Sequence, residues 1–369
     1  MPPDVLDLFT DLAAVPSPPG NERGVADLVL RYLADCGLEP DEDGAGPGIG
    51  SNAGNIYARL EPTAAGEPLL FCAHLDTVPP TAAIEPVVED GTVRNVAGTI
   101  LGADDKSAVA AMLEAARSVL AESRPHAGIE LLFTPQEEVG LIGATAFDHE
   151  RLQARIGFVY DQAAPIGTVI LGAPYSQSLE VTFHGKAAHS GMHPDEGRSA
   201  IAAAARAISE MRLGRVDELS TANVGTINGG TDTNIVPEWC TFVAEARSHD
   251  ERRLADLVQE MQDAITFAAG VAECEASTVV RKSYRGYRFG RTDRPVVLAA
   301  AALARCGHAV RYELSGGAAD ANVFNERGMQ VVNLANGMTD IHTPAERIAV
   351  ADLEAMVDVT LALVEEALD

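Results

Sequence analysis

The stretch GIELLFTPQEEVG, residues 128–140, contains the pattern that decides the fold. Its apolar run from Ile129 to Phe133 predicts a buried strand, which Pro135 ends. Two adjacent carboxylates, Glu137 and Glu138, follow directly. Because neighbouring acids repel each other and do not favour folding, their position at the end of a strand indicates a function.

The same arrangement, a metal-capable side chain beside an apolar strand, occurs elsewhere in the chain. The other members of this set are His74 and Asp76 in FCAHLDTVPP, Asp104 and Asp105 in LGADDKSAVAAM, Asp161 in FVYDQ, and His342 in GMTDIHTPAER. Taken alone, each has a simpler interpretation: HLD as a turn, ADDK as a helix N-cap, EE as a solvated face, and His342 as a loop histidine without a task. Their shared position next to apolar strands favours a common site.

The spacing of helical and strand patterns predicts two domains. Over residues 1–173 strands alternate with helices, which predicts a three-layer α/β domain with a mostly parallel sheet. Within this part, DGTVRNVAGTI is predicted to be a loop. Residues 174–289 follow a β-α-β-β-α-β order, which predicts an inserted two-layer α+β sandwich. The α/β rhythm returns over residues 290–369, so we expect these residues to complete the first domain.

A parallel sheet gathers the loops at the carboxyl ends of its strands at one edge, where ligands bind. Six acidic or imidazole groups that meet there need cations. Two zinc ions bridged by one carboxylate, with a histidine and a carboxylate at each end, satisfy them and leave one acid as a general base. We therefore expect Glu138 to ligate metal and Glu137 to transfer a proton, with Asp76 placed to accept the second ring N–H of His74. Ligands of this type without thiolate would also fit cobalt or manganese.

Composition excludes several classes of partner. The formal net charge of −27 disfavours nucleic acid and anionic membranes. No apolar run reaches the roughly 20 residues of a membrane span, and the N-terminal sequence lacks the pattern of a signal peptide. The five cysteines are scattered and show no CxxC spacing. They suit reduced thiols, so the sequence predicts a cytoplasmic protein.

The order of five segments carries a resemblance. AHLDTVP, GADDKSA, TPQEEVG, YDQ and IHTPAE resemble the di-zinc metallopeptidase family of peptidase T, aminoacylase and glutamate carboxypeptidase. The inserted region is similar to the lid of that family in HGKAAHSGMHPDEGRSAI and GGTDTNIVPEWCTFVAEARSHD. GADDK, EEVG and AEARSH are most similar to the peptidase T-like branch. The resemblance covers nearly the whole chain.

The resemblance implies a role for each matching residue. One zinc ion would be held by His74 and Asp161 and the other by Glu138 and His342, with Asp104 as the bridge. Asp76 would orient His74, Glu137 would be the general base, and His189 would stabilise the oxyanion, reaching the site of a neighbouring subunit. Asn234 and the SGGAADAN segment, with Gly316, Gly317 and Asp320, fall where family members contact the substrate or shape its pocket. Alternatively, Asn234 is a turn residue and the glycines permit positive φ.

The expected function is that of a zinc-dependent exopeptidase. Aspartate at position 161 goes with aminopeptidases in this family, so the resemblance implies cleavage of short peptides by a metal-bridged hydroxide, in a homodimer formed through the inserted domain. The alternative is an N-acyl amino acid amidohydrolase or a carboxypeptidase with the same metal site. A non-catalytic scaffold would be expected to have lost Glu137 or a ligand. The arginine-rich segment 281–295 either pairs with surface acids, which we favour, or binds a substrate carboxylate.

Overall fold

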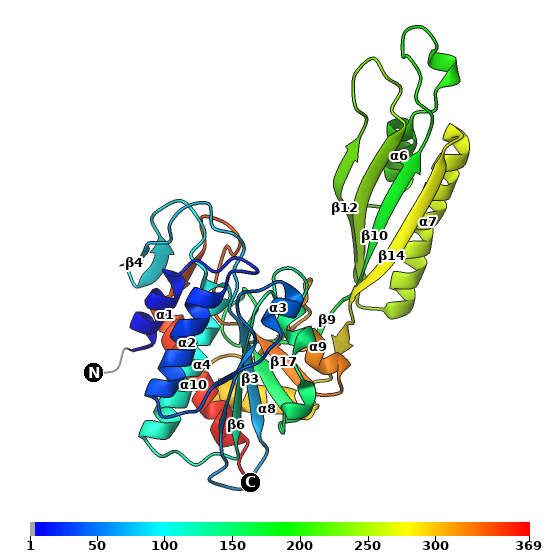
Figure 1. The fold of residues 1–369 in the computed structure, drawn as a ribbon. Helices are drawn as coiled ribbons and strands as arrows, with labels where there is room; N and C mark the ends of the chain where they lie inside the picture. Colours follow the sequence, from blue (N-terminus) through cyan, green and yellow to red (C-terminus); the bar gives the residue numbers. More distant parts are fainter. Residues whose placement is uncertain (1–3) are drawn as a thin grey trace. The chain divides into compact units, whose positions relative to one another are not determined.

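The apolar run of the opening stretch is strand β6 (Ile129–Thr134), which lies in a large mixed sheet. In the computed structural model (Figure 1), which describes residues 4–369, the order of this sheet is β1-β2-β6-β3-β7-β17-β8-β16. Its other strands are β1 (Asp41–Glu42), β2 (Ile56–Leu60), β3 (Leu69–His74), β7 (Ile156–Val159), β8 (Thr168–Ile170), β16 (Arg311–Glu313) and β17 (Gln330–Leu334). Strands β6, β3, β7 and β17 are parallel, so their carboxyl ends lie at one edge.

Helices cover this sheet. They are α1 (Val5–Ala13), α2 (Arg23–Asp35), α3 (Gly46–Ile49), α4 (Ala103–Ala121), α5 (Ile142–Ala146), the short 3₁₀ helix η1 (His149–Arg151), α8 (Arg294–Arg305), α9 (Ala321–Glu326) and α10 (Val350–Glu366). Helix α4 packs on β3, and α10 packs against α4, α1 and α8, whereas α9 packs on β17 and α5. Every residue of β3 and β6 is buried, which requires cover on both faces. The predicted three-layer α/β arrangement is confirmed.

One predicted loop is a small sheet instead. Strands β4 (Pro86–Glu89) and β5 (Thr92–Asn95) form a hairpin, and β18 (Arg347–Ala349) pairs with β5. Asp90 and Gly91 both have positive φ, which is the conformation of a two-residue hairpin turn that Asp-Gly favours. The prediction of a loop over DGTVRNVAGTI was therefore wrong for its first residues. The strands are short, and only the Asp-Gly pair signalled them.

Residues 174–287 form a separate unit, which we call the inserted unit; the rest of the chain is the host unit. Its strands are β10 (Tyr175–His184), β11 (Gly214–Asp217), β12 (Ser220–Gly229), β13 (Trp239–Ser248) and β14 (Glu275–Tyr284), with helices η2 (Pro194–Glu196), α6 (Ala200–Glu210) and α7 (Glu251–Ala272). The sheet is antiparallel in the order β11-β12-β13-β10-β14. Along β13, Phe242 and Ala244 are buried under α6 and α7, whereas Val243 is exposed. This is the predicted two-layer α+β sandwich.

The chain leaves the host unit after β9 (Gly172–Ala173) and returns through β15 (Tyr287–Arg288). The backbone N–H of Phe289 donates to the carbonyl oxygen of Leu171 at 2.7 Å. The outgoing and returning segments of the host unit are therefore adjacent.

Two further predictions concern the whole described chain. Among residues 4–369, none of the helices has the length and apolarity that crossing a bilayer requires. The five cysteines are all free thiols.

Candidate active site

The strand order reverses at β3. The chain passes from β3 through α4 to β6 on one side, and then crosses to β7 on the other side. Such a reversal leaves a crevice outside the carboxyl ends of the strands. His74 is the last residue of β3, Glu137 and Glu138 follow β6, and Asp161 follows β7. The fold thus brings to one crevice the groups that the sequence placed at strand ends.

Four of the predicted metal ligands form a continuous chain of contacts. His74 Nε2 lies 3.2 Å from Asp104 Oδ1, and His342 Nε2 lies 3.1 Å from Asp104 Oδ2. The same His342 nitrogen lies 3.0 Å from Glu138 Oε1. Each oxygen of the Asp104 carboxylate therefore faces one imidazole, which is the placement that a bridging ligand needs.

The fifth predicted ligand belongs to a second cluster around His74. Donor atoms of His74, Asp104 and Glu138 lie within 4.8 Å of one another, and so do those of His74, Glu137 and Asp161. The backbone N–H of Asp161 donates to Asn333 Oδ1 at 2.9 Å, and Asn333 Nδ2 donates to the Asp161 carbonyl at 2.6 Å. Sequence reasoning missed Asn333, whose signal was a polar residue directly after the apolar pair Val331 and Val332 in the strand QVVNL.

Asp76 contacts His74 through a different atom from the one we expected. His74 Nδ1 lies 2.8 Å from the backbone carbonyl of Asp76 but 3.6 Å from its carboxylate, which is too long for a hydrogen bond. The carboxylate instead accepts the backbone N–H groups of Glu137 at 2.8 Å and Glu138 at 3.1 Å. Asp76 therefore joins the ends of β3 and β6 and fixes the backbone of the two glutamates.

Burial and crowding shift the protonation of these groups. Contacts with Asp104 and Glu138 raise the pKa of His342 to about 10. Burial would raise the pKa of Asp104, but hydrogen bonds from His342 and His74 outweigh it and lower the pKa. Burial raises the pKa of Glu137 and of Asp161 well above the ordinary range, and each of these groups is further raised by neighbouring carboxylates. The crevice therefore holds more negative charge than its imidazoles can compensate.

The donor set fits divalent cations. Among residues 4–369, no side chain donates a hydrogen bond to the carboxylate of Glu137 or Asp161. Buried carboxylates are normally paired or bound to metal, so carboxylates without such donors are suited to be ligands of a divalent cation. Imidazole nitrogen and carboxylate oxygen are common zinc ligands, and without thiolate they also accept cobalt or manganese.

A pocket of about 270 Å³ opens onto these ligands. It is lined by Asp104, Glu137, Glu138, Asp161, Gln162, Ala163, Ser315, Gly316, Gly317, Ala318, Ile341 and His342. None of these lining residues is a lysine or an arginine. The pocket of the host unit is therefore strongly acidic.

The SGGAADAN segment divides between this pocket and the core. Gly316 and Gly317 line the pocket; neither has a positive φ, and a Cβ atom on Gly316 would meet no other atom within 4 Å. Their lack of side chains therefore keeps the pocket open, and the positive-φ alternative does not apply. Asp320 lies behind the pocket, only 2% exposed, and accepts the hydroxyl of Thr134 at 2.6 Å. Burial raises the pKa of Asp320 to about 6.

His189 and Asn234 lie in neighbouring loops of the inserted unit. The N–H of Ser190 donates to the Asn234 carbonyl at 2.9 Å. His189 Nδ1 accepts the backbone N–H groups of Gly191 and Met192, both at 3.2 Å. A neutral His189 with an accepting Nδ1 carries its proton on Nε2, so the exposed ring presents an N–H donor. Asn234 lies in a turn, and its contact with substrate stays a prediction.

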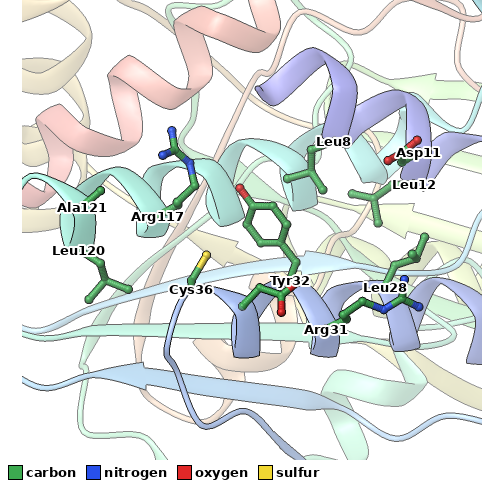
Figure 2. A pocket seen from close by; sticks show the side chains of 11 residues that line it. Leu8, Asp11, Leu12, Leu28, Arg31, Tyr32, Cys36, Arg117, Leu120 and Ala121 are labelled. Atoms are coloured by element: carbon green, nitrogen blue, oxygen red, sulfur yellow. The ribbon is translucent and has the colours of Figure 1, made fainter. Parts of the chain in front are cut away.

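A larger cavity of about 680 Å³ lies among helices α1, α2 and α4 and contains none of the predicted site residues. Figure 2 shows Tyr32 of α2 pointing toward the helix that carries Arg117. Glu114 accepts both the Tyr32 hydroxyl at 3.1 Å and Arg117 Nε at 2.7 Å. The polar groups of Tyr32, Arg117 and Glu114 in this cavity thus satisfy one another. The acidic crevice is therefore the better candidate for an active site.

Known proteins resemble this chain along its whole length. Two family profiles match, one described as "Peptidase dimerisation domain" of the M20 peptidases over residues 172–273 and one as "Peptidase family M28" over residues 55–193. The crystal structure of aminopeptidase PepT from Bacillus cereus is 36% identical, with a TM-score of 0.90 and 98% of each chain covered. A tripeptidase from Staphylococcus aureus is 35% identical, with a TM-score of 0.93, covering 98% of this chain and 97% of that one.

Two curated relatives are similar to this chain over different shares of its length. The uncharacterised protein YqjE of Bacillus subtilis is 37% identical over 363 residues, which is 98% of each chain. A probable carboxypeptidase of Aspergillus niger is more distant, at 32% identity over 77% of this chain and 68% of that protein.

Proposed function

Because this chain belongs to the M20 family of metallopeptidases, in its peptidase T-like branch, we propose that it is an aminopeptidase that hydrolyses short peptides. The observation that carries the proposal is the acidic pocket, in which Asp104 lies between two imidazoles and no lining residue is a lysine or an arginine. The similarity to an aminopeptidase and a tripeptidase over 98% of the chain supports the reaction class.

We infer that the crevice holds two divalent cations, with zinc as the natural candidate for its nitrogen and oxygen donors. His74 and Asp161 would hold one ion, Glu138 and His342 the other, and Asp104 both. Such a pair supplies a polarised scissile carbonyl and a water molecule with a pKa near neutrality. The remaining chemistry falls to the side chains of this protein.

We propose that Glu137 transfers the proton. Burial raises its pKa, so its carboxylate is a better base than an exposed glutamate. Asp76 holds the Glu137 backbone N–H, which fixes where the side chain begins. Glu137 takes a proton from the attacking water and returns it to the leaving amine. The carboxylate therefore acts first as a base and then as an acid.

Substrate recognition follows from the charge of the pocket. The α-ammonium group of a free peptide is attracted to a pocket lined by four carboxylates, those of Asp104, Glu137, Glu138 and Asp161. A substrate carboxylate would find no lysine or arginine there. This favours an aminopeptidase over a carboxypeptidase or an N-acyl amino acid amidohydrolase, whose substrates present an anion and, in the second case, lack the amine.

The inserted unit would complete the site. His189 offers an exposed Nε2–H of the kind that stabilises an oxyanion. We propose that it serves the active site of a second copy of this chain, bound through the inserted unit, and that Asn234 beside it contacts substrate. The match of residues 172–273 to a peptidase dimerisation domain supports this. A cytoplasmic location also stays a prediction, supported by the scattered free thiols.

The test compares substrates that differ only at the amino end. Zinc-loaded protein is assayed with a free tripeptide, with the same tripeptide acetylated at its N-terminus, and with an N-acetyl amino acid. We expect hydrolysis of the free tripeptide alone. Faster hydrolysis of the N-acetyl amino acid would replace the aminopeptidase with the amidohydrolase alternative, and faster hydrolysis of the acetylated tripeptide would replace it with the carboxypeptidase alternative. No hydrolysis of any substrate by protein with two bound ions would favour a scaffold.

A further inference from the structure

Glu346 lies in the same loop as His342 but binds a distant part of the chain. Its Oε2 accepts the backbone N–H groups of Leu101 at 2.7 Å and Gly102 at 2.9 Å. Its Oε1 accepts the backbone N–H of Asp104 at 3.0 Å. The side chain is only 2% exposed. Three backbone donors therefore converge on one buried carboxylate, more than 240 residues away in sequence.

Leu101 and Gly102 lead into helix α4, and Asp104 is its second residue. The first backbone N–H groups of a helix have no partner within it. The residue at the N-cap is Gly102, which has no side chain to accept them and adopts a φ of 79°. Glu346 takes over this task from outside the helix. A carboxylate at a helix N-terminus is also favoured by the helix dipole.

The other end of this connection is the loop that carries His342. Thr339 and Arg347 close the loop with a pair of backbone hydrogen bonds of 3.0 and 3.2 Å. The Thr343 hydroxyl donates to the Asp340 carbonyl at 2.6 Å, and the N–H of Glu346 donates to the Thr343 carbonyl at 3.1 Å. Glu346 thus stands at the base of a closed loop that has His342 near its tip.

We propose that Glu346 is a positioning residue that fixes the spacing between Asp104 and His342. This inference rests on the ligand roles that the proposed function gives to these two residues. Glu346 holds the Asp104 backbone on one side and is part of the His342 loop on the other. Glu346 keeps Asp104 Oδ2 and His342 Nε2 at their separation of 3.1 Å before metal binds.

The chain offers a matched control. Glu130 lies near the start of β6, whereas Glu137 follows its end, and Glu130 is also buried. Its carboxylate accepts the backbone N–H groups of Gln153 and Ala154, the latter at 2.7 Å, and the Tyr57 hydroxyl at 2.6 Å. Both Glu346→Gln and Glu130→Gln remove a buried charge with several donors, but only Glu346 connects the two metal ligands.

The experiment titrates metal-free wild type, Glu346→Gln and Glu130→Gln with Co²⁺, followed by visible absorption and calorimetry. In Glu346→Gln we expect one of the two binding steps to weaken by about 10- to 100-fold, with an altered cobalt spectrum. We expect Glu130→Gln to bind cobalt like the wild type even where its thermal unfolding temperature falls. With the tripeptide, Glu346→Gln should lower kcat more than it changes KM.

Native cobalt affinity at both steps in Glu346→Gln would overturn the proposal, and so would an equal loss in Glu130→Gln. If Glu346→Gln does not fold, Glu346→Asp, which keeps the charge on a shorter side chain, is titrated in its place; weakened affinity then supports the proposal and native affinity overturns it. The titration needs no peptide. A wild-type chain that binds both ions but cleaves no peptide would refute the proposed function and leave this inference standing.

Discussion

The host unit and the inserted unit use polar residues in opposite ways. In the inserted unit, buried and more exposed side chains alternate along β13, and the buried ones packed in the core under the helices, from Cys240 to Ala246, are apolar. In the host unit, β3 is buried along its whole length and leads into Asp76, which is fully buried, and to the Asp104 carboxylate. Buried carboxylates cost free energy unless opposite charges compensate them. The host unit therefore concentrates buried carboxylates at one crevice, whereas the buried side chains of β13 carry no charge, so we expect bound cations to stabilise the host unit more than the inserted unit.

The largest effect should come from Glu137, to whose carboxylate no side chain among residues 4–369 donates a hydrogen bond. Glu137→Gln keeps the size of the side chain but removes its ability to accept a proton. We expect kcat for a tripeptide to fall by about 10²- to 10⁴-fold, with unchanged metal content by elemental analysis. Exposed Glu150→Gln, on η1, should keep full activity. Normal turnover in Glu137→Gln would refute the role of general base.

Metal removal should affect the thermal stability of the two units differently. A site occupied at about 1,000 times its dissociation constant stabilises the folded state by about 4 kcal/mol. Chelation should therefore lower the unfolding temperature of the host unit, measured by circular dichroism. Trp239, the only tryptophan of the chain, lies in the inserted unit, so its fluorescence reports that unit alone. We expect the fluorescence transition to move less.

Two other outcomes would change the comparison. Equal shifts of both transitions would show that the units unfold as one body. An unchanged host transition after complete chelation would contradict the dependence on ions.

A smaller effect should appear at Asp320. Its folded pKa of about 6 exceeds the ordinary value of 3.8, so the folded state binds more protons than the unfolded state between about pH 4 and 6. Stability therefore falls as pH rises through this range, and the full cost is present above pH 6. Asp320→Asn should stabilise the metal-free protein at pH 7.5 by on the order of 1–3 kcal/mol and give no gain at pH 4.

Urea denaturation at the two pH values measures this difference, with exposed Asp256→Asn on α7 as the control. A gain at Asp320→Asn that is the same at both pH values would show that packing, and not charge, limits stability behind the crevice.

The smallest effect should come from Arg281, the first residue of the arginine-rich segment, which lies in the inserted unit. Arg281 pairs with Glu180 at 3.1 Å, and both side chains are more than half exposed. Exposed pairs contribute little, so Arg281→Ala should change the free energy of unfolding by at most about 0.5 kcal/mol and leave KM unchanged. A large rise in KM for tripeptides would instead assign Arg281 to substrate binding and revive the alternative that we did not favour.

Most of the fold, and the position of the candidate ligands at strand ends, were accessible from the sequence because their signals are local. A buried run followed by a polar residue marks a strand end, as at His74 and Glu137, and parallel strands bring such ends together. The hairpin at Asp90 and Gly91 was missed because its strands have only four residues each. Local patterns are weakest for such short elements.

Contacts between distant residues were not accessible. The sequence suggested the Asp76 carboxylate as the hydrogen-bond partner of His74. In the structure that carboxylate accepts two backbone N–H groups after β6, and His74 Nδ1 contacts the backbone carbonyl of Asp76 instead. Likewise, nothing near Glu346 indicates that its donors lie at the start of α4. The sequence grouped Asp320 with Gly316 and Gly317 as a candidate substrate-contacting residue. The fold shows that the two glycines line the pocket, whereas Asp320 lies behind it. Which donor meets which acceptor depends on tertiary structure.

The adjacent backbone of Leu171 and Phe289 is a junction at which the host unit could be closed without the inserted unit. Because the outgoing and returning strands already touch, a short turn could join them and leave the order of the host strands unchanged. The inserted unit is therefore a segment that could be removed or exchanged at one place in the chain, without altering the strand order that forms the acidic crevice.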